Sequence, residues 1–378
     1  MTTQTIEPTL PTYAESCLDA LSTSVLASLG VPGEPNPLRL PPADRVCLLL
    51  VDGLGWDLLS AHPAAAPFLS ELAMTAAPLT AGFPATTATG LATLGTGRSP
   101  GRHGLLGYQV AIPGSGRLLN ALRWDDQVDP VRWQPGSTIF ERAVSAGVRA
   151  YRVAPAALRK SGLSAAAMRG ADYAAADTIG ALVSRTASAL AEASPALALA
   201  YYGDLDSTGH ALGCGSDAWQ YELAHVDKLA EQLAAALPHG TVLHVTADHG
   251  MVDVSPGERF DVDALPQLRA GVALLGGEPR ARHVYCQPGA ADDVQASWSE
   301  VLGDRFWVTG REQAVADGWF GPVDAQFTAR IGDVIAAPCG PSAIVATKAE
   351  PRESALIGLH GSLTPSDQFV PLLTVAMT

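Results

Sequence analysis

The sequence predicts an α/β fold, in which a mostly parallel sheet is covered by helices on both faces and a small α/β insertion interrupts the later part of the chain. Three observations support this class. Continuous apolar runs, typical of buried parallel strands, alternate with helical patterns over the first two thirds of the chain. The 378 residues exceed a single small domain, and 47% of them are apolar, ample for a core. After about residue 280 the pattern changes to shorter strands and helices.

The predicted elements follow in chain order. Apolar residues at helical spacing predict a helix over Tyr13–Leu29, which Gly30 can end. The apolar run Val46–Val51 predicts the first buried strand. Thr138 and Glu141 have the spacing of a capping box at a helix start. Further strands are expected at Val148–Val153, Ala196–Tyr202 and Val242–Thr246, and further helices at Leu182–Leu190 and Trp219–Leu237.

The later part of the chain predicts the insertion. Short strands and helices between about 282 and 322 indicate a small α/β unit, and the segments 331–337 and 343–347 are expected to form a hairpin. The segment 368–375 contains Pro371 and should be an edge strand. We therefore divide the chain into a core α/β domain over 1–270, an insertion or lid over 271–328, and a return to the core over 329–378.

Charge and composition exclude several classes of partner. The formal net charge of −14 argues against nucleic acid or an anionic membrane surface as the main partner, because both favour basic faces. The five cysteines are scattered and never spaced C-x-x-C, so neither a disulfide framework nor a thiolate zinc site is expected. We find no signal peptide pattern and no apolar run long enough for a membrane span, and we expect a cytoplasmic protein.

Acids and histidines gather where predicted strands end. Three carboxylates and three imidazoles are involved, and together they suffice for two divalent metals: Asp52, Asp206, His210, Asp248, His249 and His360. Ligands of parallel sheets bind beyond the carboxyl ends of the strands, which predicts one shared site. A turn around Gly209 would aim Asp206 and His210 inward together. Asp248 and His249 can both serve only if their strand has already ended, because neighbours on a strand point to opposite faces.

Each of these residues also has a simpler interpretation. A single Asp at a strand end is more often a helix cap, and a lone His is more often a hydrogen-bonded structural residue. The combination of three strand ends with His360 favours metal binding over that interpretation. The pair Gly53 and Gly55 resembles part of a dinucleotide fingerprint, but the third glycine is missing, so we exclude that function.

A second feature is a run of threonines at a predicted helix start, Phe83-Pro84-Ala85-Thr86-Thr87-Ala88-Thr89-Gly90. Backbone amides at a helix start bind anions, and a hydroxyl placed there can attack one. Taken alone, the run is better explained as a simple threonine N-cap. Beside a metal site, it predicts a nucleophile.

These motifs together resemble the alkaline phosphatase superfamily, and within it the nucleotide pyrophosphatase/phosphodiesterase branch. The resemblance spans about residues 45–373 and is carried by Asp52-Gly53, the threonine run, Asp206-Ser207-Thr208-Gly209-His210, Asp248-His249-Gly250-Met251 and His360-Gly361. It implies an alkaline-phosphatase-like fold. The family places its nucleophile ten residues before the glycine of a Thr-Gly step, which here is Thr96-Gly97, so the resemblance implies Thr87.

The resemblance also implies the ligand sets. One metal would be held by Asp206, His210 and His360, and the other by Asp52, Asp248, His249 and the Thr87 hydroxyl. Zinc is the expected metal, and the same donors accept manganese or iron. The family carries an asparagine three residues after the nucleophile, where this chain has Gly90, so an oxyanion donor is either missing or replaced. The Ala88 amide is our candidate donor.

We therefore expect metal-dependent hydrolysis of phosphoric esters, most simply by a phosphodiesterase or nucleotide pyrophosphatase acting on a small anionic phosphoester such as a nucleotide. Thr87 would attack phosphorus and form a phosphothreonine that water then hydrolyses. Two alternatives stay open. One is a phosphomonoesterase, phosphonate hydrolase or phosphomutase on the same scaffold, and the other is a non-catalytic protein that binds an anion.

Overall fold

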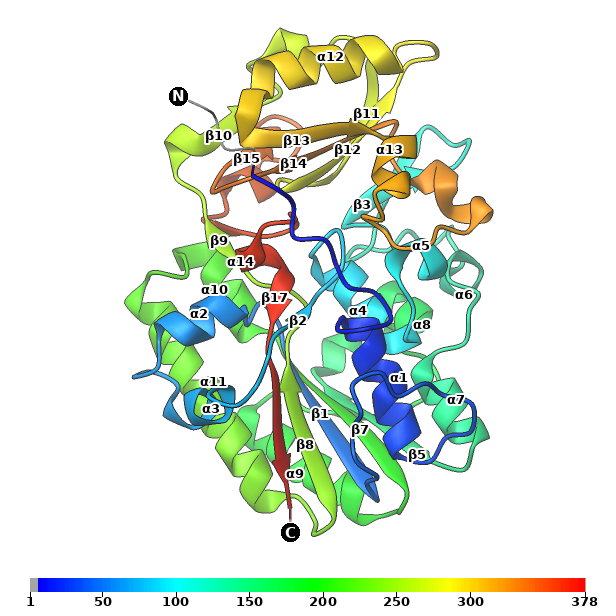
Figure 1. The fold of residues 1–378 in the computed structure, drawn as a ribbon, viewed down its shortest axis with the longest axis vertical. Coiled ribbons are helices and arrows are strands. Elements are labelled where there is room, and N and C mark those ends of the chain that lie inside the picture. Colours follow the sequence, from blue (N-terminus) through cyan, green and yellow to red (C-terminus); the bar gives the residue numbers. More distant parts are fainter. Residues whose placement is uncertain (1–5, 378) are drawn as a thin grey trace.

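A computed structural model of the chain describes residues 6–377, and its central feature is a six-stranded sheet with the strand order β18-β8-β1-β7-β5-β6 (Figure 1). Five strands are parallel, and only β18 runs antiparallel, at the edge beside β8. Their bounds are β1 Arg45–Val51, β5 Arg149–Ala154, β6 Asp172–Ala175, β7 Ala196–Tyr202, β8 Thr241–Thr246 and β18 Leu372–Ala376. The fold class predicted from the sequence is thereby confirmed.

The central strands are buried because helices cover both faces of the sheet. Every residue of β1 after Arg45 is buried, as the continuous apolar run predicts. One layer of mutually contacting helices comprises α1 Leu18–Ser28, α4 Thr87–Thr96, α7 Ile139–Ser145 and α8 Gly162–Ala167. The other comprises α2 Trp56–Ala61, α3 Pro67–Ala73, α9 Ile179–Ala191, α10 Asp204–Leu212 and α11 Asp217–Ala236 (Figure 1).

Local sequence signals explain several of these boundaries. The capping box at α7 is present in full, because the Thr138 side chain accepts from the Glu141 amide and the Glu141 carboxylate accepts from the Thr138 amide. Helix α4 ends at Gly97, whose positive φ of 62° suits glycine. Pro371 separates β17 Phe369–Val370 from the edge strand β18, as expected for a residue without an amide hydrogen.

A second sheet stands at one end of the molecule, at the top of Figure 1. Its four antiparallel strands have the order β11-β12-β14-β13, and it has a separate apolar core that includes Trp298 of α12. The bounds are β11 Val272–Glu278, β12 Ala281–Cys286, β13 Phe306–Gly310, β14 Val334–Pro338 and α12 Ala291–Leu302. Helix α13 Arg311–Ala316 packs against β13 and β14.

The predicted hairpin between 331–337 and 343–347 is wrong. Strand β14 is flanked by β12 and β13, and β15 Ala343–Val345 instead pairs with β10 Arg259–Asp261. Both edges of β14 are therefore already occupied, which leaves no edge for β15. The division of the chain into domains at residues 270 and 328 stays a prediction. Strand β14, which lies after residue 328, belongs to the second sheet.

The remaining elements are short. They include the hairpin β3 Gln109–Ile112 and β4 Arg117–Asn120, which packs on β11, and the pairs β2 Leu79–Thr80 with β17 and β9 Val252–Asp253 with β16 Gly358–Leu359. Short helices are α5 Pro100–His103, α6 Pro130–Trp133 and α14 Pro365–Gln368, and short 3₁₀ helices occur at 156–160, 256–258, 266–268, 303–305, 325–330 and 353–355. Within residues 6–377, none of the helices has the length and apolarity that crossing a membrane would require.

Candidate metal centre and active site

The predicted ligands meet at the carboxyl edge of the three central parallel strands. Asp52 directly follows β1, helix α10 begins two residues after β7, and Asp248 comes two residues after the end of β8. In the register, Val51 lies beside Tyr202 and Leu50 beside Thr246, so the three strands end at the same level. The parallel arrangement therefore places residues about 200 positions apart in sequence at one edge.

The first group of potential metal ligands is Asp52, Asp248 and His249, whose donor atoms all lie within 4.8 Å of one another. The Nε2 atom of His249 is 3.3 Å from Oδ1 of Asp52 and 3.8 Å from Oδ2 of Asp248. All three side chains are buried. Because β8 has ended at Thr246, both Asp248 and His249 can face the same point, as the sequence requires for a shared site.

Neighbouring groups orient these ligands. The Tyr201 hydroxyl donates to Oδ2 of Asp52 at 2.6 Å, and the Gly53 amide donates to Oδ1 of Asp248 at 3.2 Å. The Nδ1 atom of His249 lies 2.9 Å from its acceptor, the carbonyl oxygen of Gly250. That contact assigns the ring hydrogen to Nδ1 in the neutral imidazole and leaves Nε2 free to bind a metal.

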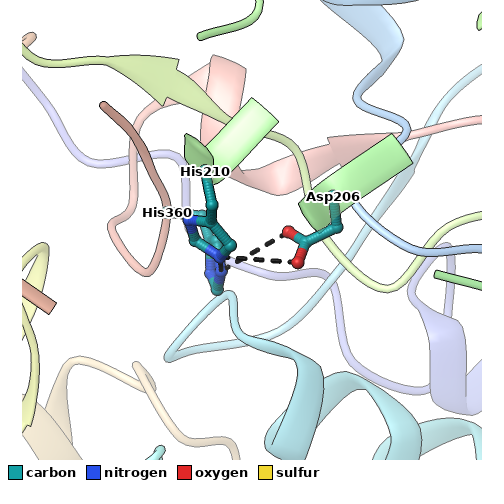
Figure 2. Close-up of side chains that lie close together, drawn as sticks. All are labelled: Asp206, His210 and His360. Carbon is teal, nitrogen blue, oxygen red and sulfur yellow. Dashed lines mark hydrogen bonds and ion pairs between the residues drawn. The ribbon is translucent and has the colours of Figure 1, made fainter. Parts of the chain in front are cut away.

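The second group is Asp206, His210 and His360 (Figure 2). Asp206 and His210 lie one turn apart on α10, so a helix, and not the predicted turn, aims both at one point. The Nε2 atom of His210 is 3.4 Å from Oδ2 of Asp206, and that of His360 is 3.9 Å from Oδ1. The rings of His249 and His360 stack with centroids 3.6 Å apart, which makes the two groups immediate neighbours.

Both histidines of the second group present a lone pair to this point. Nδ1 of His210 lies 2.6 Å from the carbonyl oxygen of Gly358, and Nδ1 of His360 lies 2.9 Å from that of Ala85. Since carbonyl oxygens only accept, each Nδ1 donates. The two Nε2 atoms then face each other at 3.3 Å without a hydrogen between them, an arrangement that a cation would stabilise.

The protein alone does not balance the charges at this site. Burial opposes ionisation of Asp52, but the hydrogen bond and charge of His249 outweigh it and lower the Asp52 pKa. Burial likewise opposes the imidazolium of His249, yet the Asp248, Asp52 and Asp206 carboxylates raise its pKa to about 10. Burial, followed by the charge of Asp52, raises the pKa of Asp248 to about 7 and that of Asp206 well above its ordinary value.

The chemistry of the donors fits two divalent cations. Burial lowers the pKa values of His210 and His360, which keeps both imidazoles in the neutral, metal-binding form. Among residues 6–377, Oδ1 of Asp206 and Oδ2 of Asp248 are buried without a hydrogen-bond donor. Leaving such oxygens unpartnered costs about 1–3 kcal/mol each, and more when they are charged. One such atom belongs to each group, so each lacks the partner that a metal would supply.

Thr87 stands at the start of α4, directly beside the first group. Its Oγ1 atom lies 3.2 Å from Nε2 of His249 and 3.5 Å from Oδ1 of Asp52. It is also the one residue between Ala81 and Gly90 that is not fully buried. The Ala88 amide belongs to the first helical turn, whose amides have no acceptor within the helix. The hydroxyl and a free amide therefore occur together at the site.

The close contacts of Gly90 explain why this position, which holds asparagine in the family, has no side chain in this chain. A β-carbon at Gly90 would lie 2.6 Å from Cβ and 2.7 Å from the carbonyl oxygen of Asp248. Helix α4 thus packs directly on the backbone that carries a potential metal ligand. An asparagine at this position would collide with that backbone unless α4 moved outward.

A cleft of about 270 Å³ opens over the site, with Thr87, Asp206, His210 and His360 among its lining residues. Its other walls include side chains that no sequence motif marked: Tyr108, Leu122, Arg123, Glu278, Arg352, Glu353 and Leu356. They flank the hairpin β3–β4, end strand β11 or lie in the segment before β16. These segments are far apart in sequence and meet only through tertiary packing, including that of the β3–β4 hairpin on β11, so no spacing along the chain could have revealed them.

The comparison with known families agrees with this geometry. The model of the type I phosphodiesterase / nucleotide pyrophosphatase family matches residues 46–363. The chain belongs to this family. Membership makes it a hydrolase of phosphoesters and confirms the resemblance seen in the motifs. No curated protein matches the sequence significantly.

Solved structures show the same fold at low sequence identity. Murine ectonucleotide pyrophosphatase / phosphodiesterase 5 is 18% identical, with 88% of each chain covered and a TM-score of 0.70. The human protein of that name is 20% identical, with 88% of this chain and 87% of the other covered and a TM-score of 0.66. Phosphonoacetate hydrolase from Sinorhizobium meliloti is 18% identical, covering 88% and 90%, with a TM-score of 0.66.

Proposed function

We propose that this phosphodiesterase-family chain cleaves a phosphodiester or pyrophosphate bond with Thr87 as nucleophile and with two divalent metals, for which zinc is the expected ion. The observation that carries the proposal is the position of the Thr87 hydroxyl, 3.2 Å from His249 and 3.5 Å from Asp52. Beside it lie two ligand groups, each with a buried, unpartnered carboxylate oxygen. Asp206, His210 and His360 would hold one metal, and Asp52, Asp248 and His249 the other.

The metals, when bound, would lower the pKa of the hydroxyl and neutralise charge on the phosphoryl group. The chain's own residues supply the rest. Oγ1 of Thr87 attacks phosphorus, the bond to the leaving oxygen breaks, and a phosphothreonine remains. Oδ1 of Asp52, to which the hydroxyl donates at 3.5 Å, is the nearest carboxylate oxygen that can accept its proton. The Ala88 amide at the helix start donates to a phosphoryl oxygen, and water then hydrolyses the phosphothreonine and restores Thr87.

The structural relatives are consistent with a small phosphorus-containing anion as substrate. An inactive threonine-to-alanine variant of the murine relative was solved in complex with AMP. The hydrolase from Sinorhizobium meliloti was solved with phosphonoacetate. We therefore propose a small phosphoester, such as a nucleotide derivative, as the substrate, and keep phosphonate hydrolysis as the second candidate because of this likeness.

Activity measurements on metal-depleted protein reconstituted with zinc or manganese test the proposal. We expect hydrolysis of bis(p-nitrophenyl) phosphate to exceed that of p-nitrophenyl phosphate. Thr87→Ala should lower kcat by at least about 10³-fold, whereas Thr87→Ser, which keeps a hydroxyl, should retain measurable turnover. Full diesterase activity in Thr87→Ala would refute the nucleophile.

The same preparations separate the alternatives. Preference for p-nitrophenyl phosphate would indicate a monoesterase, and phosphate release from phosphonoacetate would indicate a phosphonate hydrolase. Negligible turnover of every substrate after reconstitution would favour a non-catalytic anion-binding protein. Asp248→Ala and His360→Ala should each lose metal, and unchanged metal content by elemental analysis would contradict the ligand assignment.

A further inference from the structure

Two arginines on the cleft wall have no partner in the protein. Arg123 and Arg352 line the same cleft as Thr87 and His360. Within residues 6–377, neither guanidinium forms an ion pair or a hydrogen bond, and the contact of Arg123 is through its backbone amide only. By contrast, Arg282 of the second sheet is buried and forms an ion pair with Glu350 at 2.7 Å. Both unpaired cations are therefore available to a ligand in the cleft.

The backbone around each arginine is held in place although the side chain is free. Oδ1 of Asn120 accepts from the amides of Leu122 at 3.0 Å and of Arg123 at 2.9 Å, which defines the turn after β4. On the other segment, the Ser354 amide donates to the Glu350 carbonyl at 2.9 Å, which closes a turn around Arg352. The cleft wall therefore presents two charges from ordered segments.

Hydrogen bonds join these two segments across the cleft wall, and one of them runs from Nε2 of Gln109 to Oε1 of Glu350 at 3.4 Å. The Tyr108 hydroxyl, at the start of the β3–β4 hairpin, donates to Oε1 of Glu353 at 3.1 Å. Arg123 and Arg352 therefore flank a connected wall and not two independent loops. The wall also carries two acids: Glu353 accepts from the Tyr108 hydroxyl, and the buried Glu278 accepts from the Tyr108 amide at 2.9 Å through Oε2, while its Oε1 has no hydrogen-bond partner among residues 6–377.

The charge distribution points to the class of ligand. The chain carries a net charge of −14, against which two exposed, unpaired cations on the cleft wall stand out. The phosphoryl group that reacts would be bound at Thr87 and the metal ligands, which are more buried than the arginines, and it does not account for two exposed cations on the cleft wall. Arginine recognises carboxylate and phosphate through paired N–H donors.

We propose that Arg123 and Arg352 form a second anion subsite, so that the substrate is a phosphodiester carrying a further anionic group, a carboxylate or a phosphate, on one of its ester substituents. Leu122 and Leu356, which line the cleft beside them, would contact the apolar part of that substituent. The inference depends on the proposed function, because the reacting phosphodiester must be bound at Thr87.

Three diesters with the same chromogenic group test the subsite: p-nitrophenyl propyl phosphate, p-nitrophenyl 2-carboxyethyl phosphate and p-nitrophenyl 2-phosphoethyl phosphate. We expect the wild-type protein to prefer at least one anionic ester by about tenfold in kcat/KM. The two anionic arms distinguish a carboxylate from a phosphate. Arg123→Gln with Arg352→Gln should remove that preference and change the propyl ester by less than about twofold. The preference should also weaken in high salt.

Arg185→Gln is the matched control, because Arg185 is an exposed arginine on α9, outside the cleft, and the charge change per site is the same. Equal preference of the wild-type protein for all three esters, or an unchanged preference in the double variant, would overturn the subsite. An equal loss of the preference in Arg185→Gln would show that the effect comes from the overall electrostatic field, and this result would also overturn the subsite.

If even the propyl ester is not hydrolysed, the proposed function fails instead. Titration calorimetry with the same esters then still decides the subsite. Tighter binding of an anionic ester than of the propyl ester, lost in the double variant, would support it, and equal binding would refute it.

Discussion

Replacing Gly90 by alanine is a sharp test of how α4 and the proposed metal centre depend on each other. Gly90 lies in the first half of α4, three residues after Thr87, and is buried against Asp248. An added β-carbon would lie 2.6 Å from Cβ of Asp248, about 0.8 Å short of the 3.4 Å at which ordinary contact begins. The second contact, at 2.7 Å, is with a backbone oxygen, which cannot rotate away.

Two opposing energies set the expected stability. Alanine is favoured over glycine inside a helix by about 1 kcal/mol. Overpacking a close contact costs about 1–3 kcal/mol. The variant should therefore be less stable than wild type by up to about 2 kcal/mol. Because the strain falls on a proposed metal ligand, we also expect metal affinity to decrease by about 10–100-fold, the range seen when ligand orientation is disturbed.

Gly180 provides the matched control, since it also lies near the start of a helix, α9, and has nothing within 4 Å of an added β-carbon. Gly180→Ala should be neutral or stabilise the protein by up to about 1 kcal/mol and leave metal binding unchanged. Urea unfolding of both variants with a chelator present measures the stability difference. Titration calorimetry with zinc measures affinity. Wild-type metal affinity in Gly90→Ala would refute the tight coupling of α4 to Asp248.

Three further predictions concern the surroundings of the site. Tyr201→Phe removes the hydroxyl that donates to Asp52 at 2.6 Å and should weaken zinc binding by about tenfold in calorimetry. Tyr202→Phe, on the same strand, should leave zinc binding unchanged because its hydroxyl contacts Glu222. Equal zinc affinities in the two variants would exclude this orienting role of Tyr201. With a pKa of about 10, His249 is protonated at pH 7 and must lose that proton to bind a metal. Metal binding should therefore release protons, and the apparent metal affinity should rise as the pH increases toward 10. Calorimetry in buffers of different ionisation enthalpy measures the proton release, and a binding enthalpy independent of buffer would contradict it. Asp367→Asn leaves the fully buried Arg280 without its carboxylate partner. The variant should lose about 3–5 kcal/mol of unfolding free energy in urea. A loss below about 1 kcal/mol would show that the ion pair is dispensable.

Much of the core could be predicted because its signals are local. A buried parallel strand such as β1 is a continuous apolar run, and α7 is marked by the capping box at Thr138. The potential ligands could be proposed because each follows such a strand, and parallel strands end at one edge. The failed hairpin shows the limit, since the partners of β14 and β15 depend on which strand edges are already occupied.

By itself, the sequence determined the fold class, the family and the residue types available for chemistry, because strand runs, caps and short motifs are properties of neighbouring residues. Only the tertiary structure decided that Gly90 must be small and that Tyr108, Arg123 and Arg352 share a wall with Thr87. These are contacts between segments far apart in sequence. Their distances depend on how these segments pack against one another in the folded chain, and no local pattern of residues records that packing.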